Sequence, residues 1–100
     1  MKMLVKIHKS YREVVAICDS ELIGKRLEEG IMQLEISENF FKGEEKTEKE
    51  AVNIMKNASG DDATFNIVGR QAVDAALKAG IISREGIRSV QGVPFALVLM

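Results

Sequence analysis

The sequence predicts an α/β domain of the α+β class, in which a mixed β-sheet of about five strands packs against two main helices. Two apolar segments near the N-terminus lie close enough to pair as a hairpin, and two amphipathic segments further on have the helical period. Apolar residues make up 46% of the 100 residues, enough for one core and too few for two. We therefore expect residues 1–100 to form a single domain.

The first two strands are expected over residues 3–8 and 14–18. In the first, Met3, Val5 and Ile7 alternate with more polar positions, which is the period of a half-buried strand. The second is a continuous apolar run and reads as more buried. Because the connection is short, the pair is predicted to form an antiparallel hairpin.

The segment from residue 19 to residue 46 carries weaker signals. Asp19 or Ser20 is a candidate N-cap, but Gly24 lowers helix propensity by about 1 kcal/mol relative to alanine. A turn with at most a short helix is predicted there. Apolar and polar residues alternate over residues 31–36, which predicts a strand with one solvent-exposed face. Gly43 marks a turn.

The next segments read as helix, strand and helix. Thr47 and Glu50 form a capping box that opens a helix over about residues 48–58. Residues 64–68 are a short buried strand, and residues 70–79 form a second helix that ends at glycine. Strand 31–36, the first helix and strand 64–68 are expected to make one right-handed crossover with parallel strands.

The C-terminal part predicts two more strands. Residues 87–90 form a short one, Gln91-Gly92 makes a turn, and the apolar run from Phe95 to Met100 forms the last. Pro94 lacks an N–H group, so it belongs at an edge or a strand start. An apolar edge strand invites pairing, and a homodimer through this C-terminal edge strand is one hypothesis.

Composition excludes several classes of function. The chain has 14 basic and 15 acidic residues, a net charge of -1, so no global field attracts nucleic acid or anionic lipid. One cysteine and one histidine cannot complete a structural zinc site, and no cofactor or metal is expected. Neither a signal peptide nor a membrane-length apolar run is present, and these features favour a cytoplasmic protein.

Two groups of residues are candidate binding sites. Gly69, Arg70 and Gln71 follow a strand and begin a helix, where backbone N–H groups and a guanidinium can hold an anion; the competing interpretation is an ordinary packing corner. The second candidate group is a basic surface for a partner or RNA, made of Lys25, Arg26, Phe41 and Lys42. Glutamates interleave with this group, so a solvated surface is the favoured interpretation.

Cys18 and His8 carry no convincing catalytic signal. Cys18 ends an apolar strand, and a buried structural thiol is favoured over an activated nucleophile. His8 would have to reach it across the hairpin. We therefore assign no catalytic residue.

Four motifs occur in a familiar order: CDSELIGKRLEEG, FFKGE, IVGRQAVDAALKAGII and GVPFALVLM. Together they resemble the small archaeal proteins of domain-of-unknown-function family 424, over nearly the whole chain. The family pattern often has histidine where this chain has Phe95, which argues against a catalytic or metal role at that position. The resemblance implies an archaeal cytoplasmic origin and brings no activity with it.

Two functions remain open. The first is a non-enzymatic binding or accessory module that acts through a protein or RNA partner in archaeal information processing. The alternative is an enzyme or sensor that binds a small molecule or anion at the corner formed by Gly69 and Arg70.

Overall fold

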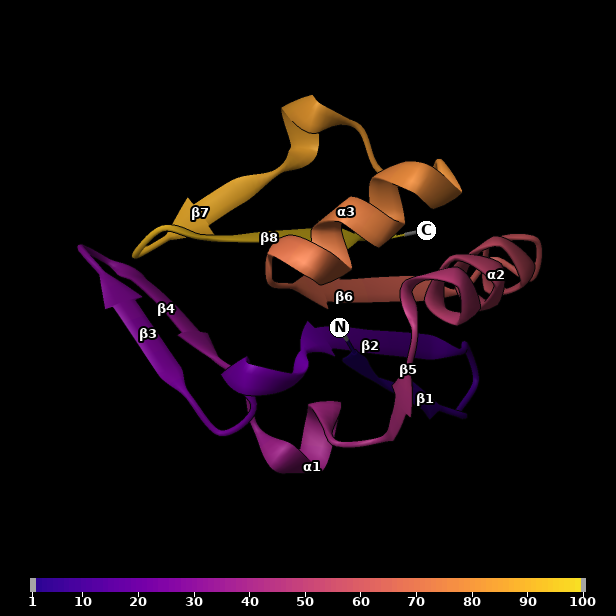
Figure 1. The fold of residues 1–100 in the computed structure, drawn as a ribbon, viewed down its shortest axis with the longest axis horizontal. Helices are drawn as coiled ribbons and strands as arrows, with labels where there is room; N and C mark the ends of the chain where they lie inside the picture. Colours follow the sequence, from indigo (N-terminus) through magenta and orange to yellow (C-terminus); the bar gives the residue numbers. More distant parts are fainter. Residues whose placement is uncertain (1, 100) are drawn as a thin grey trace.

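The computed structural model describes residues 2–99, which form a six-stranded mixed sheet and a separate two-stranded hairpin (Figure 1). The strand order in the main sheet is β5-β1-β2-β6-β8-β7. The strands are β1 (Met3–His8), β2 (Val14–Asp19), β3 (Arg26–Glu29), β4 (Met32–Glu35), β5 (Glu44–Lys46), β6 (Thr64–Val68), β7 (Arg88–Val90) and β8 (Val93–Val98). The helices are α1 (Glu38–Phe41), α2 (Glu48–Ser59) and α3 (Arg70–Ala79), with 3-10 turns η1 (Ser20–Leu22) and η2 (Arg84–Gly86). The α+β class is confirmed.

The predicted hairpin is confirmed, because β1 and β2 pair antiparallel. The predicted crossover is wrong in its first strand: β6 pairs parallel with β2, while β4 pairs only with β3 outside the main sheet. The reason lies in burial. Every residue of β2 after the first is buried, as a central parallel strand requires, whereas β3 and β4 have no fully buried residue.

Helices α2 and α3 pack on one face of the sheet and enclose the larger core. The capping box of α2 is confirmed: Glu50 Oε1 accepts from the Thr47 N–H at 2.9 Å, and Thr47 Oγ1 accepts from the Glu50 N–H at 3.3 Å. Gly80 ends α3 in the left-handed conformation, as its position predicts. The largest fully buried side chains of this core are Met3, Val15, Ile17, Met55, Phe65 and Ile67.

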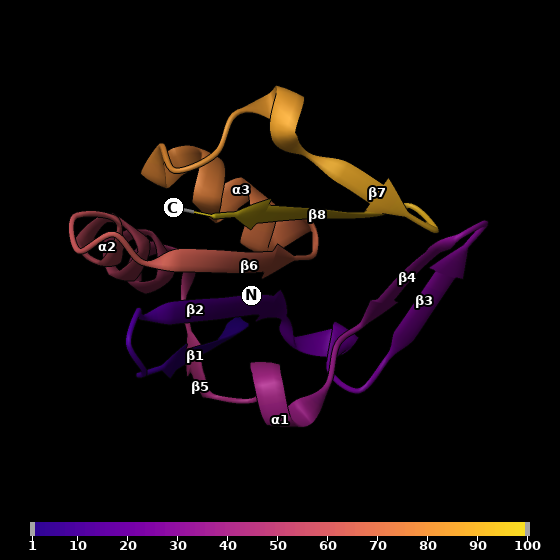
Figure 2. The same cartoon turned by 180° about the vertical axis from the view of Figure 1, so that it is seen from behind.

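A smaller core lies on the opposite face of the sheet. It is covered by η1, the β3–β4 hairpin and the short helix α1, which was not predicted from the sequence. In Figure 2, β6 and β8 lie in front of α3, the β3–β4 hairpin lies at the right and α1 lies at the bottom. The buried members of this core are Leu4, Ala16, Cys18, Leu22, Ile36, Phe41 and Val68.

Gly43, predicted to mark a turn, lies where two backbones meet. A Cβ atom at this position would lie less than 3.0 Å from backbone atoms of both Val5 and Lys6, the strand against which β5 pairs. The glycine is therefore needed for a close approach of β5 to β1.

The C-terminal strand is not an edge strand over its first half. β8 lies between β6 and β7, and β7 forms the edge of the sheet, which corrects the prediction made from the sequence. The register of β7 with β8 ends at the pair Arg88–Phe95, so the outer side of β8 is free from Ala96 onward among the described residues. A two-residue turn with positive φ at Gln91 and Gly92 joins the two strands. Met100 lies outside the described residues.

Within residues 2–99, no helix is long and apolar enough to cross a membrane. In the same part of the chain, His, Cys, Asp and Glu side chains do not gather in groups of three that could hold a metal ion.

Candidate functional site

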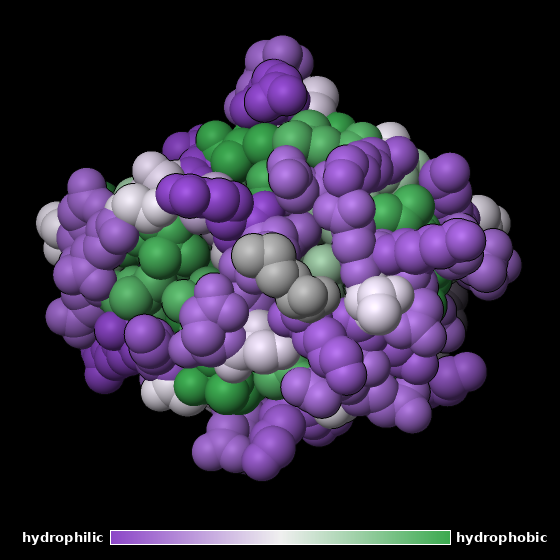
Figure 3. Space-filling view, in the orientation of Figure 1, coloured by the Kyte–Doolittle hydropathy of each residue, from purple (hydrophilic) through white to green (hydrophobic). Residues whose placement is uncertain are grey.

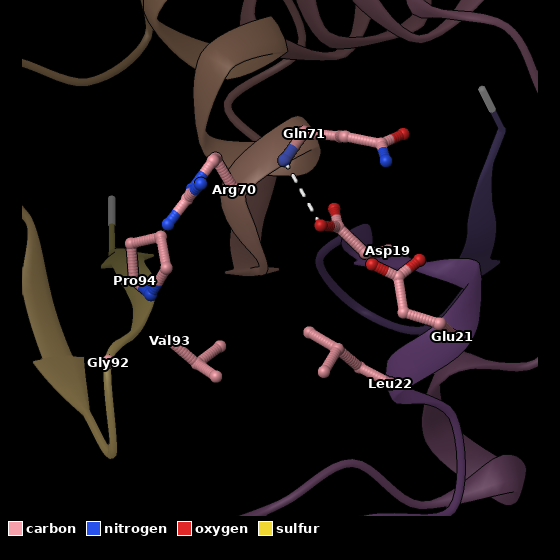
Figure 4. Close-up of a pocket in the computed structure, with 8 residues that line it drawn as sticks. All are labelled: Asp19, Glu21, Leu22, Arg70, Gln71, Gly92, Val93 and Pro94. Atoms are coloured by element: carbon pink, nitrogen blue, oxygen red, sulfur yellow. Dashed lines mark hydrogen bonds between the residues drawn. The ribbon is translucent and has the colours of Figure 1, made fainter.

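A pocket of about 330 Å³ lies at the carboxyl ends of β2 and β6, where these neighbouring parallel strands both end (Figure 4). η1 and the residue before it form one wall, and the start of α3 with the β7–β8 turn forms the other. The lining residues are Asp19, Glu21, Leu22, Arg70, Gln71, Gly92, Val93 and Pro94. Two of the three residues predicted for an anion site, Arg70 and Gln71, therefore line a real cavity.

Asp19 is the polar centre of this region, and it caps a different helix from the one predicted from the sequence. Its side chain is 3% exposed and makes no cap for η1. Instead Oδ1 accepts from the Ala72 N–H at 2.8 Å and Oδ2 accepts from the Gln71 N–H at 3.1 Å. Asp19 thus caps α3 from a different strand. The sequence near α3 indicates this cap only indirectly. The N-cap residue of α3 is a glycine, which has no side chain to accept a hydrogen bond from the helix.

Gly69 makes room for that cap. Its φ of 109° and ψ of 155° fall in a region that only glycine occupies readily. A Cβ atom at this position would also lie less than 3.0 Å from three atoms of the Asp19 carboxyl group. The glycine is needed both for its backbone conformation and for the space beside it.

The cap changes what the corner at Gly69 offers to a ligand. The N–H groups of Gln71 and Ala72 already bind a carboxylate of the chain itself, so an external anion would have to displace Asp19 to use them. The Arg70 side chain is exposed beside the pocket, and no ion pair of Arg70 is found in the described part of the chain. The Arg70 guanidinium and the pocket beside it are therefore the features of this corner that remain available to a ligand.

The electrostatics of Asp19 reflect its burial. Loss of solvent raises the pKa of this carboxyl group above its usual 3.8, and the charge of Glu21 raises it further. The hydrogen bonds from the backbone N–H groups of Gln71, Ala72 and Arg70 lower the pKa, but they do not cancel the effect of burial. Burial therefore disfavours the charged form of Asp19 more than these hydrogen bonds favour it.

The predicted partner or RNA surface is only partly present. Lys25, Arg26 and Lys42 are exposed, but Phe41 is 4% exposed and packs in the smaller core, so its ring is not available to stack on bases. Arg26 pairs with Glu28 at 3.1 Å, and Lys42 pairs with Glu38 at 3.3 Å. The prediction is wrong for Phe41. Of the two adjacent phenylalanines, Phe41 is the one that faces the sheet.

A second hollow, which the sequence analysis missed, opens on the sheet face opposite α2 and α3. It has a volume of about 200 Å³ and is mostly apolar. We call it the apolar groove; it is lined by Leu34, Glu35, Phe40, Phe41, Asn66, Ile67, Val68, Phe95, Ala96 and Leu97. One wall comes from β4 and α1, and the opposite wall comes from β8.

Hydrophobic side chains gather in separate patches on a mainly hydrophilic surface, as the view of Figure 3 shows for one face. Five large hydrophobic side chains are exposed among the described residues: Ile7, Tyr11, Ile31, Leu97 and Leu99. Only Leu97, which is 56% exposed, also lines the apolar groove. Leu99, two residues further along, is 73% exposed.

Cys18 and His8 have structural surroundings. Cys18 is fully buried, and burial together with the charges of Asp19 and Glu21 raises the pKa of its thiol to about 12. The His8 ring stacks on Phe40 with centroids 4.7 Å apart, and its Nε2 lies 2.9 Å from the Phe40 carbonyl oxygen. His8 therefore helps to hold α1 on the sheet.

We expect Cys18 to resist alkylation in the folded protein. Iodoacetamide attacks the thiolate, and a pKa of about 12 leaves almost no thiolate at pH 8 even where reagent can reach the sulfur. Mass spectrometry should find the thiol unmodified without denaturant and fully modified in about 6 M guanidinium chloride. Rapid modification of the native protein would contradict the buried placement.

The chain resembles known proteins in sequence and in fold. The family model described as "Protein of unknown function (DUF424)" matches residues 8–100. The crystal structure of an uncharacterized conserved protein from Methanopyrus kandleri superposes with a TM-score of 0.87 at 25% sequence identity, and the match covers 100% of this chain and 95% of that one. The search of curated proteins finds no match.

Proposed function

We propose that this chain, which belongs to the DUF424 family of proteins of unknown function, is a non-enzymatic binding module that acts through a protein partner. The observation that supports this proposal is the apolar groove, which lies directly beside a free stretch of strand edge on β8. Contiguous exposed apolar surface commonly marks a site that a partner covers.

Main-chain groups at this edge are available for pairing. The Pro94 carbonyl oxygen accepts from the Gly69 N–H at 2.8 Å and so points toward β6. Because neighbouring residues in a strand direct these groups to opposite sides, Phe95 and Leu97 direct theirs away from β6. Arg88 of β7 faces Phe95. Because β7 begins at Arg88, no residue of β7 faces Leu97. An extended segment of another protein can bind there by adding a strand.

The floor of the apolar groove also favours a peptide, because it carries a polar side chain that can bind main-chain groups. Asn66 is half-buried at the centre of β6, opposite Leu97, and no hydrogen bond of its side chain is found within residues 2–99. Its amide can both donate to and accept from the main chain of a bound segment. Apolar walls formed by Leu34, Phe40 and Phe95 can hold a hydrophobic side chain of that segment.

The charge of the molecule favours protein over RNA as the partner. Nucleic-acid modules usually bring a surplus of basic residues, and this chain has a net charge of -1. Two of the three exposed basic residues of the predicted surface are paired with glutamates, and Phe41 is buried. A protein segment needs no such surplus.

The proposal predicts that a photo-crosslinking amino acid at position 97 captures a specific protein. We would place p-benzoylphenylalanine at Leu97, or at Ile31 as a control, because both are exposed and Ile31 lies at the distant tip of the β3–β4 hairpin. Irradiation in lysates of the source cells, with and without nuclease, should in both cases give a crosslink from position 97 that position 31 does not give. The partner is then identified by mass spectrometry and purified.

Binding of the purified partner is the deciding measurement. Leu97→Glu should weaken its affinity by at least about tenfold, while Ile31→Glu should leave it unchanged. Equal effects of the two substitutions would refute the proposal. A crosslink to a second copy of the chain, with light scattering showing a dimer, would replace it by homodimerisation through β8, and a crosslink lost on nuclease treatment would point to RNA.

A further inference from the structure

We infer that the pocket at the carboxyl ends of β2 and β6 binds a small zwitterion, a molecule with an ammonium group at one end and an anionic group at the other, as in an amino acid. The pocket shares no lining residue with the apolar groove, so this inference is independent of the proposed function.

Topology places this pocket where ligands commonly bind in sheets with parallel strands. β2 and β6 are parallel neighbours, and the chain leaves their carboxyl ends in opposite directions. η1 leads to the smaller core on one face, while α3 packs in the larger core on the other. A crevice opens between two such connections, and it is the usual ligand site of open α/β sheets. Its volume of about 330 Å³ suits a small metabolite.

The two walls carry opposite charges. Asp19 and Glu21 lie on the wall formed by β2 and η1, and Arg70 lies across the opening beside Pro94 (Figure 4). Glu21 and Arg70 are both exposed, and the described part of the chain contains no ion pair of either. An ammonium group fits the acidic wall, and a carboxylate can form two hydrogen bonds with the guanidinium.

Either charge alone fits the pocket less well. An anion without an ammonium group would face Asp19 and Glu21, and a simple amine would leave Arg70 without a partner. The end of α3 is not the binding group here, because Asp19 already holds its N–H groups. A carboxylate oxygen can accept more than one hydrogen bond, so Asp19 can still accept one from a ligand while it caps α3.

Gln71 provides a separate indication of a missing donor. Its Oε1 atom is buried and has no hydrogen-bond partner among the described residues, although buried side-chain oxygens normally have one. Figure 4 shows the Gln71 side chain on the side of Asp19, away from Arg70. Gln71 lines the same pocket, so a ligand bound there could supply this donor. Between the charged walls, Leu22 and Val93 offer apolar contacts for a short side chain.

The inference is tested by titrating the protein with the common amino acids, followed by NMR chemical shifts of the backbone N–H groups. We expect at least one amino acid to bind in the millimolar range or tighter, with the largest shifts at residues 19–22, 70–72 and 92–94. The matched decarboxylated amine and the N-acetylated acid of that amino acid should each bind at least about tenfold more weakly.

Variants locate the site. Arg70→Gln and Glu21→Gln should each weaken binding of the selected amino acid by about tenfold or more, because each removes one charge that faces the ligand. Arg84→Gln and Glu85→Gln, at exposed positions in η2, are the matched controls and should have no effect. Absence of binding by every amino acid overturns the inference, as does equal binding of the amine or the N-acetylated acid, or unchanged binding by the Arg70 and Glu21 variants. Leu97→Glu should not alter this titration, so the failure of one proposal leaves the other standing.

Discussion

Gly69→Ala should lower the free energy of unfolding by about 4 kcal/mol, the largest loss we expect from a single added methyl group in this protein. A φ of 109° costs a non-glycine residue roughly 1–3 kcal/mol. The new methyl group would also overlap the Asp19 carboxyl group and disturb its hydrogen bonds to α3, which adds a penalty of about 1–3 kcal/mol. Urea unfolding followed by circular dichroism measures the change.

Gly80→Ala is the matched control for this substitution. Gly80 also has a positive φ, of 78°, but a Cβ atom there would meet nothing within 4 Å. We expect a loss of about 1 kcal/mol, from the backbone conformation alone. If the two alanine variants are equally destabilised, the contact between Gly69 and Asp19 is not what makes the glycine necessary.

Asp19→Ala should produce the second largest effect, a loss of about 3 kcal/mol in the free energy of unfolding near neutral pH. The substitution leaves the N–H groups of Gln71 and Ala72 without an acceptor, and that of Ala72 lies in a buried residue. Each unsatisfied N–H group costs about 1–3 kcal/mol. Urea unfolding of Asp19→Ala and of Glu21→Ala provides the comparison, since Glu21 is exposed and its loss should change stability by less than about 0.5 kcal/mol.

A double substitution shows whether the two effects have one origin. In the Asp19→Ala background the carboxyl group that a methyl group at position 69 would overlap is gone. The cost of Gly69→Ala should therefore fall to about 2 kcal/mol, the backbone contribution, and the two losses should not add. Strictly additive losses would mean that the residues act independently.

The effect of Asp19→Ala should also depend on pH. Because the pKa of Asp19 is raised in the folded protein, the folded state holds this proton more tightly than the unfolded state does. The resulting stabilisation is fully present below the ordinary pKa of 3.8 and is lost as pH rises through the folded pKa. The difference in unfolding free energy between wild type and Asp19→Ala should therefore be larger near pH 3 than at pH 7. A difference that grows with rising pH would show that hydrogen bonding outweighs burial at this carboxyl group.

The sequence alone was sufficient to predict those elements whose determining interactions are short-range. The capping box at Thr47 and Glu50, the hairpin at the N-terminus and the strand, glycine and helix around Gly69 were all predicted correctly. Each depends on residues within a few positions of one another, or on the period of one apolar stripe. The resemblance to family 424 also followed from short motifs in order.

Only the tertiary structure decided which distant segments meet. Apolar runs of similar length do not say which strands pair, so the parallel partner of β6 had to be read from the fold as β2 rather than β4. The same holds for Phe40 and Phe41, of which the packing of α1 buries only the second, and for the apolar groove beside Leu97. Asp19 is the clearest case: its sequence neighbours predicted a local cap, and its place at the end of a strand beside β6 made it the cap of α3. Local preference determines the elements of this protein, and long-range packing determines its pockets.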